Sequence, residues 1–176
     1  MIVMFPITNR VFQAVVIAAA FLAPLVLILL PEKWTDKIRR FLPFLYVIVI
    51  LYLTLFSRRH RMLRAPSLIP FVSYQHFDSL YARWQVYMNV LLFIPFGFLV
   101  PFSSKRTFIQ TLLISCCLSA GIEAIQYFFS LGLCETDDVI HNTLGCVIGY
   151  LYWIFLSRIR LSLKNKNDKT ELSSKK

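Results

Sequence analysis

The sequence predicts an all-α fold, a polytopic transmembrane helical bundle of about five spans. Three observations predict it: 57% of the 176 residues are hydrophobic, only 16% are charged, and several apolar segments approach the length that crosses a bilayer. Soluble domains carry about 25% charged residues, and a helix needs roughly 20 apolar residues to cross about 30 Å of hydrocarbon. We therefore expect almost no soluble mass in this chain.

Five apolar segments follow one another and are separated by polar or proline-containing connections. The expected spans are about 11–30, 41–56, 86–102, 108–131 and 138–157. The first is interpreted as uncleaved, because its apolar run continues past Ala18–Ala20, a stretch that resembles a signal-peptide cleavage site. The third contains Pro95 and Gly97, which a membrane helix tolerates where neighbours satisfy the freed backbone groups. The fourth is expected to end at Gly132.

Two segments outside the spans have different compositions. Residues 57–85 form the longest connection and are rich in aromatic side chains. We expect part of this connection to lie in the interface or back against the helices. Residues 164–176 are polar and lack apolar periodicity, so a disordered basic tail is expected after a transmembrane domain of residues 1–163.

The formal charge of +10 is distributed in short runs beside the apolar segments, at 33–40, 58–64 and 158–176. Membrane proteins place Lys and Arg in this way, next to the headgroups, so we expect the lipid bilayer as a partner and no nucleic acid. With five spans of alternating direction, six basic residues lie on the membrane side of the N-terminus and thirteen on the side of the C-terminus. The N-terminus is therefore predicted outside the cell membrane and the C-terminus in the cytoplasm.

Polar residues inside the last two spans form two stripes at helical spacing. The stripes are Ser115-Ser119-Glu123-Gln126 in span four and Asp138-Asn142-Gly145-Gly149 in span five. Small and polar stripes usually face other helices, and Gly145 with Gly149 forms a GxxxG that permits close approach. Because spans four and five are antiparallel neighbours, we expect one stripe to lie against the other.

The same end of the bundle should receive polar residues from the other spans. Span three begins there and brings Asn89 to a comparable depth, and the end of span two delivers Arg58. Ionisable residues inside a membrane segment are costly and mark a functional site by default. The sequence therefore predicts one polar pocket at one membrane face, expected to be the outer face.

Three motifs in this order resemble the VanZ-like family. They are NVLLFIPFGFL at 89–99, EAIQ at 123–126 and DDVIHNTLGCVIG at 137–149, preceded by SLIPF at 67–71. The resemblance covers about residues 45–155. It implies a bacterial membrane protein of the cell envelope, in a family whose best-known phenotype is low-level resistance to the glycopeptide teicoplanin. The positions that match the family are Asn89, Glu123, Gln126, Asp138, Asn142 and Gly145.

Three hypotheses for function stay open at this point. The first is binding or modification of a lipid-linked envelope component, or of the glycopeptide, with Arg58, Asn89, Gln126 and Asn142 as binding residues. The second is an intramembrane hydrolase or transferase in which Glu123 acts as general base and Asp138 holds a proton or a cation, with Arg58 on a phosphate. The third is a non-catalytic scaffold or transporter subunit, with Glu123 paired to a basic residue.

A metal site is not predicted. Glu123, Asp138 and His141 offer oxygen and nitrogen donors, but they lack a dedicated spacing such as HExxH. No nucleotide-binding loop or dinucleotide fingerprint occurs in the sequence either, and the cofactor is left open.

Overall fold

The computed structural model describes residues 38–56, 79–131 and 134–174, and a few single positions elsewhere: Ala18, Leu22, Val26, Ser67, 69–71 and Tyr74. Every regular element in this part of the chain is a helix, as the sequence predicts. The elements are α3 (Leu42–Leu51), the π-helical η1 (Tyr52–Phe56), α4 (Leu80–Ser104), α5 (Phe108–Phe128) and α6 (Thr136–Ser174).

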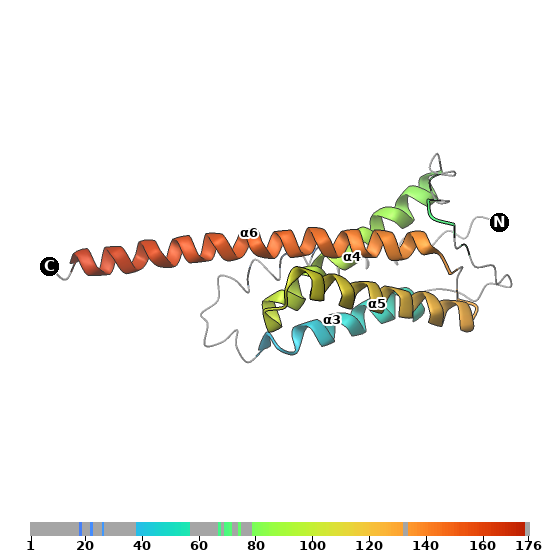
Figure 1. Ribbon diagram of the computed structural model, residues 1–176, viewed down its shortest axis with the longest axis horizontal. Coiled ribbons are helices and arrows are strands. Elements are labelled where there is room, and N and C mark those ends of the chain that lie inside the picture. The colour runs from blue at the N-terminus through green and yellow to red at the C-terminus, as the bar shows by residue number, and fades with distance from the viewer. Residues whose placement is uncertain are drawn as a thin grey trace.

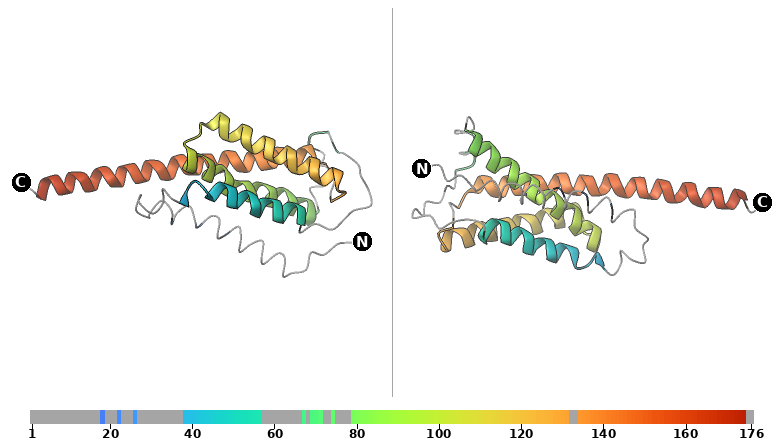
Figure 2. Two further views of the ribbon diagram at one scale, coloured as in Figure 1. Left: turned by 90° about the horizontal axis from the view of Figure 1, so that it is seen from below. Right: turned by 180° about the vertical axis from the view of Figure 1, so that it is seen from behind.

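Helix α4 is the central element of the bundle. It packs against α6 on one side and against α3 and α5 on the others (Figures 1 and 2). In the apolar stretch of 18 residues within α4, 61% of the residues are buried, compared with 28% in the corresponding stretch of α5 and 33% in that of α6. A helix that is apolar all round requires such a position, and the outer helices leave many large apolar side chains exposed, as lipid-facing surfaces do.

Three helices are long and apolar enough to cross a membrane: Ala82–Ser104, Phe108–Phe128 and Thr136–Lys166. The second expected span corresponds to a shorter apolar helix, Leu42–Leu55. The first expected span lies outside the described residues, except for three helical positions with exposed side chains, Ala18, Leu22 and Val26. The count of five spans therefore stays a prediction.

The connection from α4 to α5 is short, and it contains the caps of both helix ends. Lys105 adopts a left-handed conformation (φ 49°) and its N–H donates to the Pro101 carbonyl at 2.9 Å. Thr107 and Gln110 then form a capping box that starts α5. These caps hold the two helices antiparallel.

Helix α5 ends three residues earlier than expected, and Gly132 is not the residue that ends it. Ser130 takes the left-handed conformation instead (φ 55°). The N–H of Leu131 donates to the Gln126 carbonyl at 2.9 Å, and that of Ser130 to the Tyr127 carbonyl. This is the Schellman pattern, which satisfies the last carbonyls of a helix and stops it.

Helix α6 continues far beyond the expected end at residue 157. It runs to Ser174 and projects past the rest of the bundle (Figure 1). Residues 164–174 are helical in the structure, where the sequence predicts a disordered tail. No Gly or Pro follows Gly149 in the sequence, and extending an existing helix avoids the cost of nucleation.

Close contact between α4 and α6 depends on three glycines. A Cβ on Gly145 would overlap the carbonyl oxygen of Val90, and one on Gly149 would overlap that of Ile94. In return, a Cβ on Gly97 would overlap the backbone of Cys146. The glycines of the GxxxG therefore face α4, and the expectation that this whole stripe lies against α5 is wrong.

We predict that Gly149→Ala lowers the midpoint of thermal unfolding of the purified protein by several degrees. The added methyl group meets backbone atoms, which cannot rotate away, so the two helices must separate. Gly121→Ala on α5 is the matched control, since a Cβ there meets nothing within 4 Å. Equal midpoints for the two variants would contradict the assigned helix contact.

Candidate functional site

Helices η1 and α5 end, and α4 and α6 begin, at one end of the bundle (Figure 2). Buried polar side chains gather at this end. Six of them come from α5 and α6 and are at most 6% exposed: Glu123, Gln126, Asp137, Asp138, His141 and Asn142. Burying a polar group is unfavourable unless it finds a partner. The hydrogen bonds of this cluster therefore determine what it can do.

Asn89 and Asp138 join α4 to α6. The Asn89 Nδ2 donates to the Asp138 Oδ1 at 2.6 Å, and both residues were predicted for the site. Hydrogen bonds to an ionised carboxylate are shorter and stronger than bonds between neutral groups. The bond fixes the orientation of the Asp138 carboxylate at the first turns of α6.

Glu123 and Gln126 bind backbone groups of other elements. The Glu123 Oε2 accepts the N–H of Glu135 at 3.0 Å and so holds the α5–α6 connection over the end of α5. The Gln126 Nε2 donates to the Thr54 carbonyl at 3.2 Å. Thr54 lies in the last turn of η1, where carbonyls lack partners within the helix. Both side chains face inward, as the stripe predicts.

Asn142 and His141 each have one buried polar atom without a hydrogen-bond partner among the described residues. The Asn142 Nδ2 donates to the Ser119 Oγ at 2.8 Å, but its Oδ1 has no hydrogen-bond partner within the described residues. His141 Nε2 lies 3.0 Å from the Tyr74 hydroxyl, while Nδ1 is buried and lacks such a partner in the same part of the chain. Buried unsatisfied groups are rare and call for an explanation such as a water or a ligand.

Described residues of the long connection after η1 lie against this end of the bundle. The N–H of Ser67 donates to the Cys134 carbonyl at 2.9 Å, and the N–H of Thr136 donates back to Ser67 at 3.1 Å. Nearby, the N–H of Phe71 donates to the Asp137 carboxylate. Phe71 has a positive φ of 67°, a conformation unusual for a bulky residue.

Two site residues were missed or undervalued by the sequence interpretation. Tyr74 was counted only among the aromatics of the connection, yet its ring meets His141 edge-on at 5.7 Å. Asp137 received no role, although it is as buried as Glu123. The signal available in the sequence was the position of Tyr74 just after the SLIPF motif and of Asp137 at the start of the DDVI motif. Arg58 lies outside the described residues, so its predicted contribution is untested.

Among the residues that the structure describes, no three His, Cys, Asp or Glu side chains are grouped to hold a metal ion.

Cys134 lies beside the site in the α5–α6 connection. Burial raises the pKa of its thiol above the ordinary value, and the carboxylates of Glu123 and Glu135 raise that pKa further. Each negative charge disfavours a thiolate, which is the reactive form. The thiol should therefore react slowly at neutral pH.

We predict that Glu135→Gln accelerates maleimide labelling of Cys134 at pH 8, in a variant whose other cysteines are alanine. Removing the charge lowers the thiol pKa and increases the thiolate fraction, so the pH profile should move to lower pH. Asp168→Asn, far along α6, is the control for loss of one charge. An unchanged profile in Glu135→Gln would contradict the electrostatic assignment.

Comparisons with known proteins agree on one family. The family described as VanZ/LLP1 matches residues 42–157, a range that contains every described residue of the site. The chain is similar to Protein VanZ of Enterococcus faecium, with 31% identity over 133 residues, covering 71% of this chain and 75% of that protein. No solved structure matches the chain significantly. With its apolar helices and these matches, the chain is a membrane protein that belongs to the VanZ/LLP1 family.

Proposed function

We propose that this protein of the bacterial cell envelope binds a lipid-linked envelope component at the polar site and thereby lowers susceptibility to a glycopeptide such as teicoplanin. The name of the similar Protein VanZ supports the link to glycopeptides. The polar site supports the binding role, because its amide, imidazole and carboxylate groups can form hydrogen bonds with a ligand. Arg58, Asn89, Gln126 and Asn142 are the proposed binding residues.

The observation that carries this proposal is the pair of unsatisfied atoms at the site. The Asn142 Oδ1 and the His141 Nδ1 are buried without hydrogen-bond partners among the described residues. Leaving such a group unpaired costs about 1–3 kcal/mol. A ligand with hydroxyl or amide groups, such as the saccharide or peptide of a lipid-linked precursor, would recover that free energy on binding.

The depth of the site suits an amphiphile. Asn142 lies six residues after the start of α6, or about 9 Å along the helix axis. A lipid-linked molecule keeps its hydrocarbon chain in the bilayer and its polar group at the membrane face. The proposed site therefore meets the polar group of such a ligand without removing its chain from lipid.

A second candidate is an intramembrane hydrolase or transferase with Glu123 as general base and Asp138 as its partner. The bond from Asn89 favours it, since it holds the Asp138 carboxylate in one orientation. A third candidate, a non-catalytic scaffold or transporter subunit, is favoured by the bond from Glu135 to Glu123. In that role the carboxylate only fastens the α5–α6 connection.

Glu123→Gln separates a chemical role of the carboxylate from a structural one. Glutamine keeps a carbonyl oxygen that can accept the N–H of Glu135, but it loses the charge and cannot act as a base. In a teicoplanin-sensitive Gram-positive host, we predict that the native chain raises the inhibitory concentration. Glu123→Gln at an equal membrane level should return it to that of the empty host. Gly121→Ala on the same helix should protect like the native chain.

Three other outcomes would change the proposal. Full protection by Glu123→Gln would exclude the enzymatic candidate, and loss of that variant from the membrane would assign the carboxylate to the fold. No protection by the native chain would remove the link to glycopeptides. Gly145→Leu does not test the scaffold candidate, because Gly145 packs against α4 of the same chain and its replacement disturbs the bundle itself.

The proposed orientation places the polar site at the outer face. We predict that a membrane-impermeant maleimide labels Cys134 in intact cells at high pH, in the variant that keeps only this cysteine. Labelling confined to lysed cells would move the N-terminus and the site to the cytoplasmic side. In a second variant that keeps only Cys117, which is exposed on the apolar surface of α5, the cysteine should stay unlabelled in intact and in lysed cells because lipid covers it.

A further inference from the structure

Two aromatic rings are exposed next to each other at the polar end of the bundle. Phe71 is 61% exposed and Tyr74 is 46% exposed, and their ring centroids lie 6.1 Å apart with 49° between the ring planes. Both residues belong to the connection between η1 and α4. The pair therefore presents an aromatic surface beside the polar site.

Hydrogen bonds fasten this pair to the polar site. The N–H of Phe71 donates to the Asp137 carboxylate, and the Tyr74 hydroxyl lies 3.0 Å from the His141 Nε2. The Tyr74 ring also meets the His141 ring edge-on, with 5.7 Å between the centroids. Asp137 and His141 are themselves buried. The two rings are consequently held at the edge of the site, which lowers the entropic cost of binding a ligand on them.

The backbone of Phe71 supports a role for its ring. Its φ of 67° lies in the left-handed region, which glycine adopts freely and a bulky residue adopts rarely. Strained residues of this kind occur at ligand clamps, where the surrounding structure enforces them. A glycine here would relieve the strain and keep the N–H that donates to Asp137. The sequence has phenylalanine instead, which is explained if the ring itself has a function.

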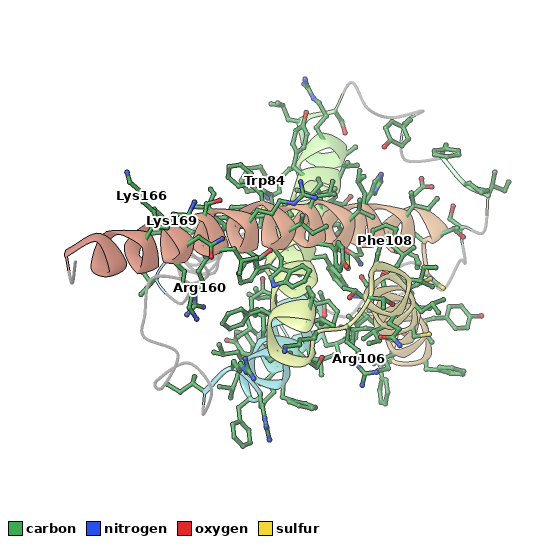
Figure 3. All side chains as sticks on the ribbon, turned by 60° about the vertical axis from the view of Figure 1, so that its left-hand side comes forward. Trp84, Arg106, Phe108, Arg160, Lys166 and Lys169 are labelled. Atoms are coloured by element: carbon green, nitrogen blue, oxygen red, sulfur yellow. The ribbon has the colours of Figure 1, made fainter. Side chains whose placement is uncertain are left out.

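Other aromatic side chains exposed at this end are explained by the membrane interface. Phe128 is 71% exposed in the last turn of α5. Trp84 lies near the start of α4, and Figure 3 shows it on one side of α6 with Arg106 on the other. Membrane proteins carry such rings at the level of the headgroups. Tyr74 differs from them because its hydroxyl group contacts a buried residue of the polar site.

The chemistry of an exposed aromatic pair beside a polar site suits a sugar. The face of an aromatic ring carries partial negative charge. In a pyranose of the glucose type the substituents are equatorial, so axial C–H groups with partial positive charge cover both faces of the sugar ring. These C–H groups can pack on an aromatic face while the hydroxyl groups at the edge reach hydrogen-bonding side chains such as Asp137. A peptide backbone offers no comparable ring face.

The level of the pair in the membrane agrees with this ligand. The N–H of Ser67, four residues before Phe71, donates to the Cys134 carbonyl in the α5–α6 connection, which lies between two apolar spans. A lipid-linked molecule with its chain in the bilayer would present its sugar outward, at the level of these connections.

We propose that the rings of Phe71 and Tyr74 form a platform on which a sugar ring of the lipid-linked ligand packs. This inference rests on the proposed function, because it names the chemical class of the group that such a ligand presents at the polar site. The platform selects the saccharide part of the ligand and not its peptide.

The test uses the full-length protein in phosphatidylcholine nanodiscs and two radiolabelled probes. One probe is a polyprenyl diphosphate capped with a methyl group, and the other is the same diphosphate carrying one N-acetylglucosamine. The probes share their chain and their charge, so the difference in affinity isolates the sugar. We expect the native chain to bind the sugar-bearing probe about tenfold more tightly, as one favourable contact with an aromatic face would give.

Substitutions then test the ring itself. Phe71→Leu keeps an apolar side chain but removes the ring, so it should abolish the tenfold preference. It should bind the methyl-capped probe like the native chain, which shows that the polar site is intact. Phe71→Tyr keeps a ring and should keep the preference. Phe128→Leu is the matched control, since it removes an exposed ring at the same end from α5.

Several results would overturn the platform. Equal affinity of the native chain for the two probes would exclude it and leave the binding of a lipid-linked component standing, whereas failure to bind either probe would remove both proposals. A full preference in Phe71→Leu would show that the ring plays no part, and loss of both probes in that variant would assign the ring to the fold. An equal loss of preference in Phe128→Leu would assign the effect to interface aromatics in general.

Discussion

The backbone contact between α4 and α6 is the constraint on which the rest of the structure depends. Gly145 and Gly149 bring α6 so close to α4 that the carbonyls of Val90 and Ile94 occupy the space of side chains. Asn89, next to Val90, consequently faces Asp138, two turns before Gly145. At the other end, Phe102 of α4 and Trp153 of α6 line the same cavity. This packing contact therefore fixes how α4 and α6 meet at the polar site.

The polar site combines stability with the capacity to bind. Its hydrogen bonds each connect two segments that are distant in sequence: α4 with α6, α5 with η1, and α5 with the start of α6. Such bonds restrict how the segments can move, because breaking one leaves a buried polar group unpaired. The His141 Nδ1 and the Asn142 Oδ1, which have no hydrogen-bond partner within the described part of the chain, come from adjacent residues on the part of α6 that these bonds hold.

Composition and helical spacing predicted the all-α class, the inward stripe of α5 and the end of the bundle at which Asn89 lies. Other features depend on geometry that spacing does not carry. The members of one stripe face different neighbours: Asn142 bonds to α5, whereas Gly145 and Gly149 pack on α4. Ser130 ends α5 because of its backbone conformation, which composition favours only for glycine. Tyr74 reaches His141 from a connection without periodicity.

The length of α6 has a mechanical consequence. Its 39 residues span about 58 Å, nearly twice the hydrocarbon thickness of about 30 Å. The helix is held at Gly145 and Gly149, and Ser174 lies about 44 Å beyond Gly145 along the axis. A tilt of about 10° around that contact would displace the far end by about 8 Å. Any rotation of α6 about the glycine contact would therefore be larger at Ser174 than at the polar end, because Ser174 lies farther from that contact.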